Sequence, residues 1–342
     1  MMGRERIRIW RLAIALLALV PGVKSAAATG AEVEPPQWAL PAVLAPRLQH
    51  GTFESAAARA SVSFHVYTPP AYDRGDGRRF PVLHWLHGTG GGVAHLRPLA
   101  AHFDAAIGAG KIPPMLIVFP NGLAEGMWCD SKDGRTPIET MLVRELVPHV
   151  DATFRTIATR DGRMIEGFSM GGYGAARIGF KHHDLFGAVS ILGAGPLDMD
   201  FKGPRATANP AQRERIFRSV WGGDIGYYRA QGPWVLAEQN RHALAGRSRI
   251  RQIVGDRDAM LPANRDLDAH LTRLGIAHDF IVPPGVGHNP LAVFGALGDA
   301  GWQFYAAAAS HDARGNPTGD AGQARRLFFA FGKAMSGDPI PH

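Results

Sequence analysis

Short apolar segments bounded by glycine, proline or polar residues recur along the chain from residue 61, and each is typical of a β-strand. The first, SVSFHVYTPP, alternates apolar and polar residues and predicts a half-exposed strand. The others are mostly apolar and predict strands that are buried on both faces. They are FPVLHWLHG (80–88), PMLIVFP (114–120), RMIEG (163–167), GAVSIL (187–192), RIRQIVG (249–255) and HDFIV (278–282).

Helical periodicity separates most of these strand segments. Residues 138–154 carry apolar side chains at helical spacing, and Pro148 is expected to kink that helix. In residues 264–275, leucines recur on one helical face and Gly275 provides a stop. Because strands and helices alternate in this way, the sequence predicts an α/β fold with a mostly parallel central sheet and helices on both faces.

The alternation marks out the domain organisation. Residues 52–309 form the predicted α/β domain, and residues 29–51, rich in Ala and Pro, are interpreted as a leader segment. Residues 195–248 have no clear strand and predict a small cap or insertion over the sheet edge. Residues 310–342 form a C-terminal tail, in which QARRLFFAFGKAM is either a short amphipathic helix on the body or part of a loose tail.

The N-terminal residues 1–28 have the pattern of an export signal. A basic stretch, RERIRIWR, precedes the apolar residues Leu12 to Val20, and small residues follow in KSAAATG, which predicts cleavage after Ala28. A membrane anchor is the alternative, but nine apolar residues are far fewer than the roughly 20 that a spanning helix needs. The protein is therefore expected to be secreted or periplasmic, with no stable membrane span after signal removal.

Composition narrows the possible functions. With 342 residues, 46% of them hydrophobic, the chain can bury a large core. Removing residues 1–28 takes away five basic residues and one acidic residue, so the net charge falls from +7 to +3. No Lys/Arg run remains that would indicate nucleic acid binding. Cys129 is the single cysteine, which excludes an intrachain disulfide, and we interpret it as a packing residue.

The stretch EGFSMGGYG contains the strongest candidate for chemistry. Ser169 directly follows the strand segment RMIEG, and a helical pattern follows it, which is the context of a nucleophile elbow. At such a turn, Cβ atoms at Gly167 and Gly171 would collide with the neighbouring strand and helix. The motif alone is weak evidence because the chain has 42 glycines, so partners elsewhere must support it.

A serine nucleophile needs a base and an orienting acid. His288, in PPGVGHNP, lies just beyond the last predicted strand and should reach the same sheet edge as Ser169. Asp256 and Asp258 both follow the strand RIRQIVG, and both remain candidates for the acid. The order Ser, Asp, His along the chain is the one that this type of fold produces.

His87 is the rival base, but it lies in LHGTGGG, where the glycines favour another role for the loop. A loop of this kind after a strand can direct backbone N–H groups at a developing oxyanion. We therefore assign the oxyanion hole to the N–H groups of Thr89 and Met170.

Several of these segments together resemble one family. FPVLHWLHGTGG, VFPNG, MWCDS, ELVPHVDATFRT, GFSMGGYGAARIGFKHHDLFGAVSILGAG, IVGDRDAML and PGVGHN occur in the order seen in the putative esterase family. This α/β-hydrolase group includes feruloyl and acetyl xylan esterases, enterochelin esterase and the antigen 85 mycolyltransferases. The resemblance covers about residues 52–308 and implies the α/β-hydrolase fold.

The resemblance also implies site residues. Ser169 would be the nucleophile, Asp258 the acid and His288 the base of a catalytic triad, with Thr89 and Met170 as oxyanion donors. The chain differs from the family pattern after the histidine, where HNPLAVF replaces an acidic residue followed by an aromatic one.

A second difference lies in MWCDS, where Cys129 replaces an aromatic residue that commonly follows the Trp128 position. Both differences fall near the expected acyl or alcohol pocket, so the substrate cannot be taken from any one relative. Trp128 is itself a candidate contact for the substrate.

These observations favour an exported serine esterase, a carboxylic ester hydrolase acting through an acyl-enzyme on a small-molecule or carbohydrate-linked ester. No metal or cofactor is required. An acyltransferase to a sugar or lipid alcohol would use the same site, and a non-catalytic binding protein could share the scaffold. Access of water to the site would distinguish the first two, and the presence of both Ser169 and His288 argues against the third.

Overall fold

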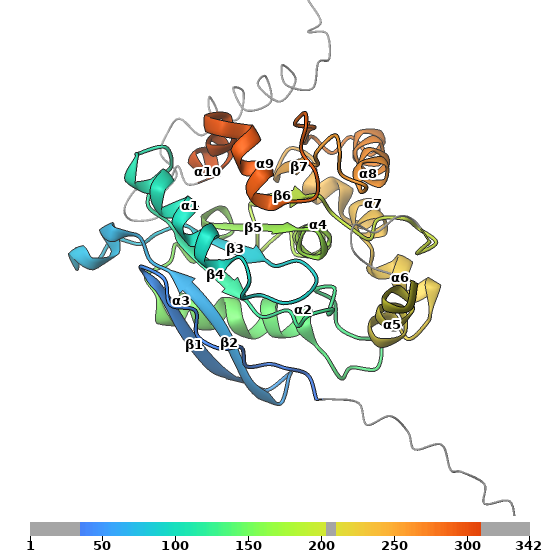
Figure 1. The fold of residues 1–342 in the computed structure, drawn as a ribbon, viewed down its shortest axis with the longest axis horizontal. Helices are drawn as coiled ribbons and strands as arrows, with labels where there is room; N and C mark the ends of the chain where they lie inside the picture. Colours follow the sequence, from blue (N-terminus) through green and yellow to red (C-terminus); the bar gives the residue numbers. More distant parts are fainter. Residues whose placement is uncertain (1–34, 203–209, 309–342) are drawn as a thin grey trace, which may run out of the picture. The chain divides into compact units, whose positions relative to one another are not determined.

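The computed structural model describes residues 35–202 and 210–308, which are built around an eight-stranded sheet (Figure 1). The strand order is β1-β2-β4-β3-β5-β6-β7-β8. The strands are β1 (Leu48–Ser55), β2 (Ala60–Tyr67), β3 (Val82–Leu86), β4 (Leu116–Pro120), β5 (Arg163–Phe168), β6 (Ala188–Leu192), β7 (Arg249–Ile253) and β8 (Asp279–Ile281). From β4 to β8 all pairs are parallel, whereas β1, β2 and β4 pair antiparallel. The predicted strands and the mostly parallel sheet are confirmed, but the prediction that β2 is half-exposed is wrong. Residues 62–67 of β2 are buried on both faces, because β2 lies between β1 and β4.

The strand β1 was not predicted and changes the interpretation of residues 29–51. It begins at Leu48, inside the predicted leader, and pairs along its whole length with β2. Upstream, Trp38 is buried and its carbonyl accepts a hydrogen bond from the Ser63 N–H. The described part of the leader is therefore integral to the fold. Its strand escaped detection because an edge strand buries few side chains, and Gly51 interrupts its alternation.

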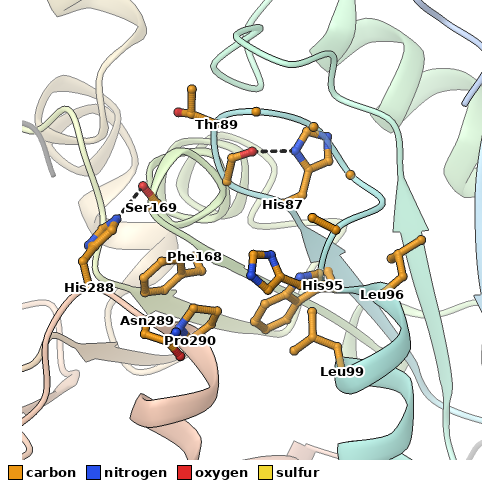
Figure 2. Close-up of a pocket in the computed structure, with 16 residues that line it drawn as sticks. His87, Thr89, His95, Leu96, Leu99, Phe168, Ser169, His288, Asn289 and Pro290 are labelled. Atoms are coloured by element: carbon orange, nitrogen blue, oxygen red, sulfur yellow. Dashed lines mark hydrogen bonds between the residues drawn. The ribbon is translucent and has the colours of Figure 1, made fainter. Parts of the chain in front are cut away.

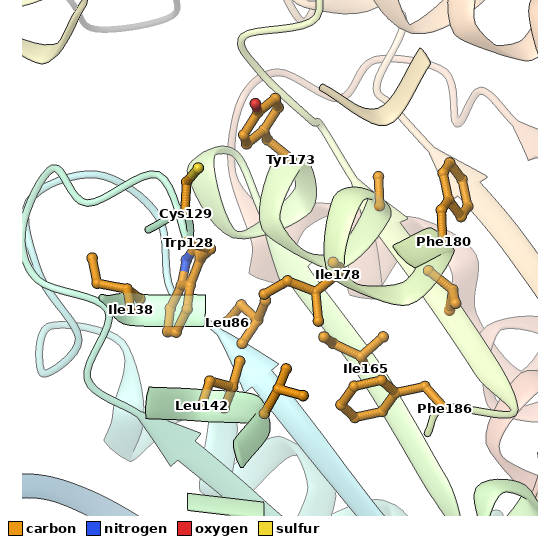
Figure 3. Close-up of a cluster of buried hydrophobic side chains, with 14 of the residues drawn as sticks. Leu86, Trp128, Cys129, Ile138, Leu142, Ile165, Tyr173, Ile178, Phe180 and Phe186 are labelled. Atoms are coloured by element: carbon orange, nitrogen blue, oxygen red, sulfur yellow. The ribbon is translucent and has the colours of Figure 1, made fainter. Parts of the chain in front are cut away.

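Two hydrophobic clusters lie on opposite faces of the sheet, because successive strand residues point to opposite sides. On one face, Leu83 and Trp85 of β3 join residues of α1 (Leu96–Gly108), α9 (Pro290–Leu297) and α10 (Gln303–Ala308). On the other face, Val82 and Leu86 join a larger cluster that includes α4 (Met170–Lys181) and α8 (Leu261–Arg273). Figure 3 shows part of this larger cluster around α4 and β5.

The predicted helix at residues 138–154 is continuous but irregular. It consists of α2 (Ile138–Thr140), a π-helical segment (Met141–Leu146) and α3 (Val147–Thr153). Pro148 lacks an N–H group, so the regular hydrogen-bond ladder is interrupted where the π-helical segment ends. The predicted helix stop is also confirmed, since Gly275 follows α8 with φ of +70°.

Between residues 195 and 248, the regular secondary structure of the described residues is entirely helical. They form α5 (Pro210–Trp221), α6 (Ile225–Gln231) and α7 (Pro233–Leu244), and α7 packs against α4. The remaining short 3-10 helices are Pro70–Arg74, Arg160–Gly162 and Gly298–Trp302. Residues 1–28 and 310–342, the predicted signal peptide and tail, lie outside the described residues. Among the described helices, none combines the length and the apolar character needed to cross a membrane.

Candidate active site

Ser169 lies at the sharp turn between β5 and α4, with φ of 60° and ψ of −118°. A positive φ is strained for a residue with a side chain and is typical of a nucleophile elbow. The predicted need for glycines is confirmed. A Cβ atom at Gly171 would lie 1.9 Å from the Leu86 carbonyl oxygen, and one at Gly167 would lie 2.3 Å from the Gly171 carbonyl oxygen.

A chain of hydrogen bonds connects Ser169, His288 and Asp258 (Figure 2 shows the first link). The distance from Ser169 Oγ to His288 Nε2 is 2.8 Å, and that from His288 Nδ1 to Asp258 Oδ2 is 2.7 Å. The buried Asp258 carboxylate also accepts the Met260 N–H at 2.9 Å. The Nδ1 proton of His288 is thus donated to the carboxylate, which leaves Nε2 free to accept the serine proton.

The structure separates the two candidate acids. Asp258 contacts His288, whereas Asp256 is exposed and its Oδ1 accepts the Val286 N–H at 3.2 Å. Its own N–H donates to the Pro283 carbonyl oxygen. Asp256 therefore links the loop after β7 to the loop after β8, which carries His288.

Thr89 and Met170 are the residues predicted to form the oxyanion hole. Met170 directly follows Ser169 and is the first residue of α4, where N–H groups have no intrahelical acceptor and the helix dipole favours negative charge. Thr89 lines the same cavity as Ser169 (Figure 2). Within residues 35–202 and 210–308, neither N–H group has a hydrogen-bond acceptor. That the two N–H groups donate to an oxyanion stays a prediction.

A cavity of about 300 Å³ opens beside Ser169. Its lining comes from the end of β3, the following glycine-rich loop, the start of α1 and the His288 loop. The apolar part includes Trp85, Leu96, Leu99, Phe168 and Pro290, and the polar part includes Thr89, His95 and Asn289 (Figure 2). Among the described residues that line the cavity, none is Asp, Glu, Lys or Arg. The cavity therefore suits an uncharged group.

The apolar residues that line the cavity were not predicted from the sequence. Leu96 and Leu99 belong to an amphipathic helix that reads as ordinary core, and both are buried. Their position at the cavity depends on how α1 packs beside β3. No local signal distinguishes them from the other apolar residues of α1.

His87, the rival base, has a different environment. It is buried, and desolvation lowers its pKa to about 4. Its Nε2 accepts the Gly122 N–H at 3.1 Å, and its Nδ1 donates to the Gly88 carbonyl oxygen at 2.8 Å. Because both ring nitrogens are occupied by backbone groups, His87 is not positioned to take a proton from Ser169.

The prediction that Trp128 contacts the substrate does not agree with the structure. Its side chain is 0% exposed, does not line the cavity, and lies in the hydrophobic cluster (Figure 3). The ring occupies space left by Gly122 and Gly174, where a Cβ would lie 2.6 and 2.5 Å from ring atoms. Its Nε1–H donates to the His87 carbonyl oxygen at 3.0 Å. Cys129 is also buried, which raises the pKa of its thiol to about 11 and fits the packing role.

Much of the chain is similar in sequence to known esterases. The sequence model of a family described as "Putative esterase" matches residues 55–274. The chain is 36% identical over 160 residues to an esterase of Mycobacterium tuberculosis, covering 46% of this chain and 34% of that protein. It is 30% identical over 169 residues to an endo-1,4-beta-xylanase/feruloyl esterase of Xylanibacter ruminicola, covering 46% of this chain and 23% of that protein. The matches thus span about a third or less of these curated relatives.

Solved structures show the same fold. A ferulic acid esterase superposes with a TM-score of 0.63 at 24% identity, covering 76% of this chain and 98% of that chain. An S-formylglutathione hydrolase from Staphylococcus aureus gives a TM-score of 0.61 at 17% identity, with the same coverage. The sheet and its helices are therefore an α/β-hydrolase fold. Since the family model matches well over half of the 342 residues, this chain belongs to the Putative esterase family.

Proposed function

We propose that the protein is an exported serine carboxylic-ester hydrolase that acts through an acyl-enzyme. The observation that carries this proposal is the unbroken hydrogen-bond chain from Ser169 through His288 to Asp258. It lies at the carboxyl edge of the sheet, beside an uncharged cavity. Membership of the Putative esterase family supports the same reaction class.

In the proposed reaction, Ser169 Oγ attacks the ester carbonyl carbon while His288 Nε2 takes the hydroxyl proton. The Asp258 carboxylate stabilises the imidazolium that forms. Negative charge develops on the carbonyl oxygen and is stabilised by the N–H groups of Thr89 and Met170. His288 then gives its proton to the leaving alcohol, and the acyl group remains on Ser169. A water molecule, deprotonated by His288, attacks the acyl-enzyme and releases the acid.

The cavity beside Ser169 favours an uncharged group of modest size, because its described lining is largely apolar and includes no charged side chain. The substrate is accordingly a small-molecule or carbohydrate-linked ester, and the feruloyl esterase relative is one guide to a first panel. Export rests on the basic and apolar pattern of residues 1–28, which supports a secreted or periplasmic location.

The test uses short p-nitrophenyl esters and the purified protein. Wild-type protein should release p-nitrophenol with an initial burst, because acylation and deacylation are separate steps. Ser169→Ala should remove both the burst and the steady turnover, while Ser219→Ala, at an exposed position on α5, should retain both. Wild-type turnover by Ser169→Ala would refute the proposal.

A further inference from the structure

The loop that carries Thr89 is held at three consecutive peptide units. The His87 carbonyl accepts the Trp128 Nε1–H, and the Gly88 carbonyl accepts the His87 Nδ1–H. The Gly90 N–H donates to the Ala124 carbonyl at 2.8 Å. Two of these three contacts come from the segment that follows β4. Each of these three peptide units is therefore held in one orientation by a hydrogen bond to a group outside the unit.

The middle peptide unit joins the Gly88 carbonyl to the Thr89 N–H. This peptide bond is trans, so its carbonyl and N–H point in opposite directions. When the His87 ring holds the carbonyl, the Thr89 N–H must point away from that ring. Gly88 lies against the elbow, since a Cβ there would be 3.4 Å from Ser169 Cβ. Figure 2 draws the hydrogen bond between the His87 ring and this peptide unit.

The hydrogen bonds of His87 also fix which ring nitrogen carries the proton. Nε2 accepts the Gly122 N–H, so the single proton of the neutral ring is on Nδ1, where it is donated to Gly88. Desolvation lowers the pKa of this ring to about 4, so it remains neutral at neutral pH. The donor to the Gly88 carbonyl is therefore constant under ordinary conditions.

We propose that His87 is a positioning residue that directs the Thr89 N–H into the oxyanion hole through the Gly88 carbonyl, and that Trp128 fixes the preceding peptide unit. This inference rests on the proposed esterase function. It assigns roles to two residues that the sequence suggested as a base and as a substrate contact. Both act on the transition state through the backbone and touch no reacting atom.

The first test compares His87→Asn with His87→Leu. Asn retains a side-chain N–H near the position of Nδ1, whereas Leu retains only apolar volume. His87→Leu should lower kcat about 100-fold, in line with the cost of losing one oxyanion donor, and His87→Asn should lower it about tenfold or less. KM should change less than about twofold, because the donor acts on the transition state.

Melting curves separate the positioning role from a loss of folded protein. His87→Leu leaves both the Gly88 carbonyl and the Gly122 N–H without their partner, so this variant should melt below the wild type. Kinetics are therefore measured well below the melting temperature of each variant, where each is folded. If folded His87→Leu has a kcat equal to or above that of His87→Asn, the inference is overturned.

The second test uses a matched pair of buried tryptophans. Trp128→Phe removes the Nε1–H that the His87 carbonyl accepts, and Trp221→Phe removes an indole N–H without a protein acceptor in the described residues. Both side chains are 0% exposed, so the two sites are equally buried. Both substitutions replace Trp with Phe, so the change in side-chain volume is the same. Trp128→Phe should lower kcat about fivefold to tenfold, and Trp221→Phe less than twofold. Equal kcat values for the two variants would count against the role of Trp128.

A boronic acid inhibitor separates failure of this inference from failure of the proposed function. Boronic acids form a tetrahedral adduct with an active-site serine, so their Ki should rise in proportion to the loss of kcat in His87→Leu and Trp128→Phe. An unchanged Ki in both variants would overturn the inference while Ser169→Ala still abolishes turnover. If Ser169→Ala remains active, both proposals fail together.

Discussion

The loops that follow β3 and β8 each bring one histidine to the carboxyl edge of the sheet, and both rings donate their Nδ1 proton. In the loop after β8, His288 donates to the Asp258 carboxylate, and its Nε2 faces the Ser169 hydroxyl. In the loop after β3, His87 donates to a neutral carbonyl, and its Nε2 is occupied by the Gly122 N–H.

The difference between the two loops lies in what surrounds each ring. A carboxylate stabilises the imidazolium of His288, and its Nε2 meets a group that can give up a proton. In the part of the chain that the structure describes, the two ring nitrogens of His87 contact backbone groups and no carboxylate. Taking a proton at Nε2 would break its bond to Gly122. Two identical side chains at the same edge are therefore suited to different tasks, one to proton transfer and the other to backbone positioning.

The most direct test of this comparison makes the same substitution, His to Asn, at both positions. His288→Asn should lower kcat by about 10⁴-fold or more, because His288 is the side chain that is hydrogen-bonded to Ser169 Oγ among the described residues. His87→Asn should cost about tenfold or less. Steady-state kinetics with one p-nitrophenyl ester measure both, and melting curves establish that each variant is folded. Equal losses at the two positions would remove the distinction.

A second large effect on kcat is expected for the carboxylate that contacts His288. Asp258→Asn should lower kcat by about 10⁴-fold, the size of loss that the corresponding change causes in a serine protease triad, because the imidazolium loses its carboxylate. Asp256→Asn should change kcat less than about threefold and lower the free energy of unfolding by about 1 kcal/mol, because the hydrogen bond that its carboxylate accepts from the Val286 N–H is only partly buried. Kinetics and urea unfolding of the two variants test this, and the reverse pattern would make Asp256 the acid.

The smallest expected effect concerns stability in acid. Burial lowers the pKa of His87 and of His84 to about 4, whereas a histidine in the unfolded chain titrates near 6.5. As the pH falls, these histidines are therefore protonated in the unfolded chain before they are protonated in the folded protein. The free energy of unfolding is highest above pH 6.5 and decreases as the pH falls from 6.5 to about 4. The loss is about 3 kcal/mol for each ring.

Urea unfolding at pH 7.5 and pH 4.5 measures this loss. His84→Phe should show a smaller decrease between the two pH values than the wild type, because one buried titrating ring is removed. His242→Gln, at an exposed position on α7, serves as the control and should behave as the wild type does. A decrease in His84→Phe as large as in the wild type would contradict the assignment.

Local patterns were sufficient for much of the fold and for the centre of the candidate site. Alternation predicted β2, and the apolar runs predicted β3 to β8, because a strand buried on both faces needs apolar residues at successive positions. The elbow was visible because Gly167 and Gly171 leave no room for a Cβ. His288 and two candidate acids, Asp256 and Asp258, could be found because polar residues that follow parallel strands meet at one edge of the sheet. The family resemblance favoured Asp258, and the structure places Asp258 against His288.

The sequence by itself therefore determined the strands, the elbow and the residues at the strand ends, since these depend on neighbours along the chain. The tertiary structure alone decided the hydrogen-bond partners of His87, the burial of Trp128 and the pairing of β1. The sequence suggested Trp128 as a substrate contact, yet its ring fills space that Gly122 and Gly174 leave open, 6 and 46 residues away. Such roles depend on long-range packing and on which backbone groups a side chain meets, and no local pattern encodes them.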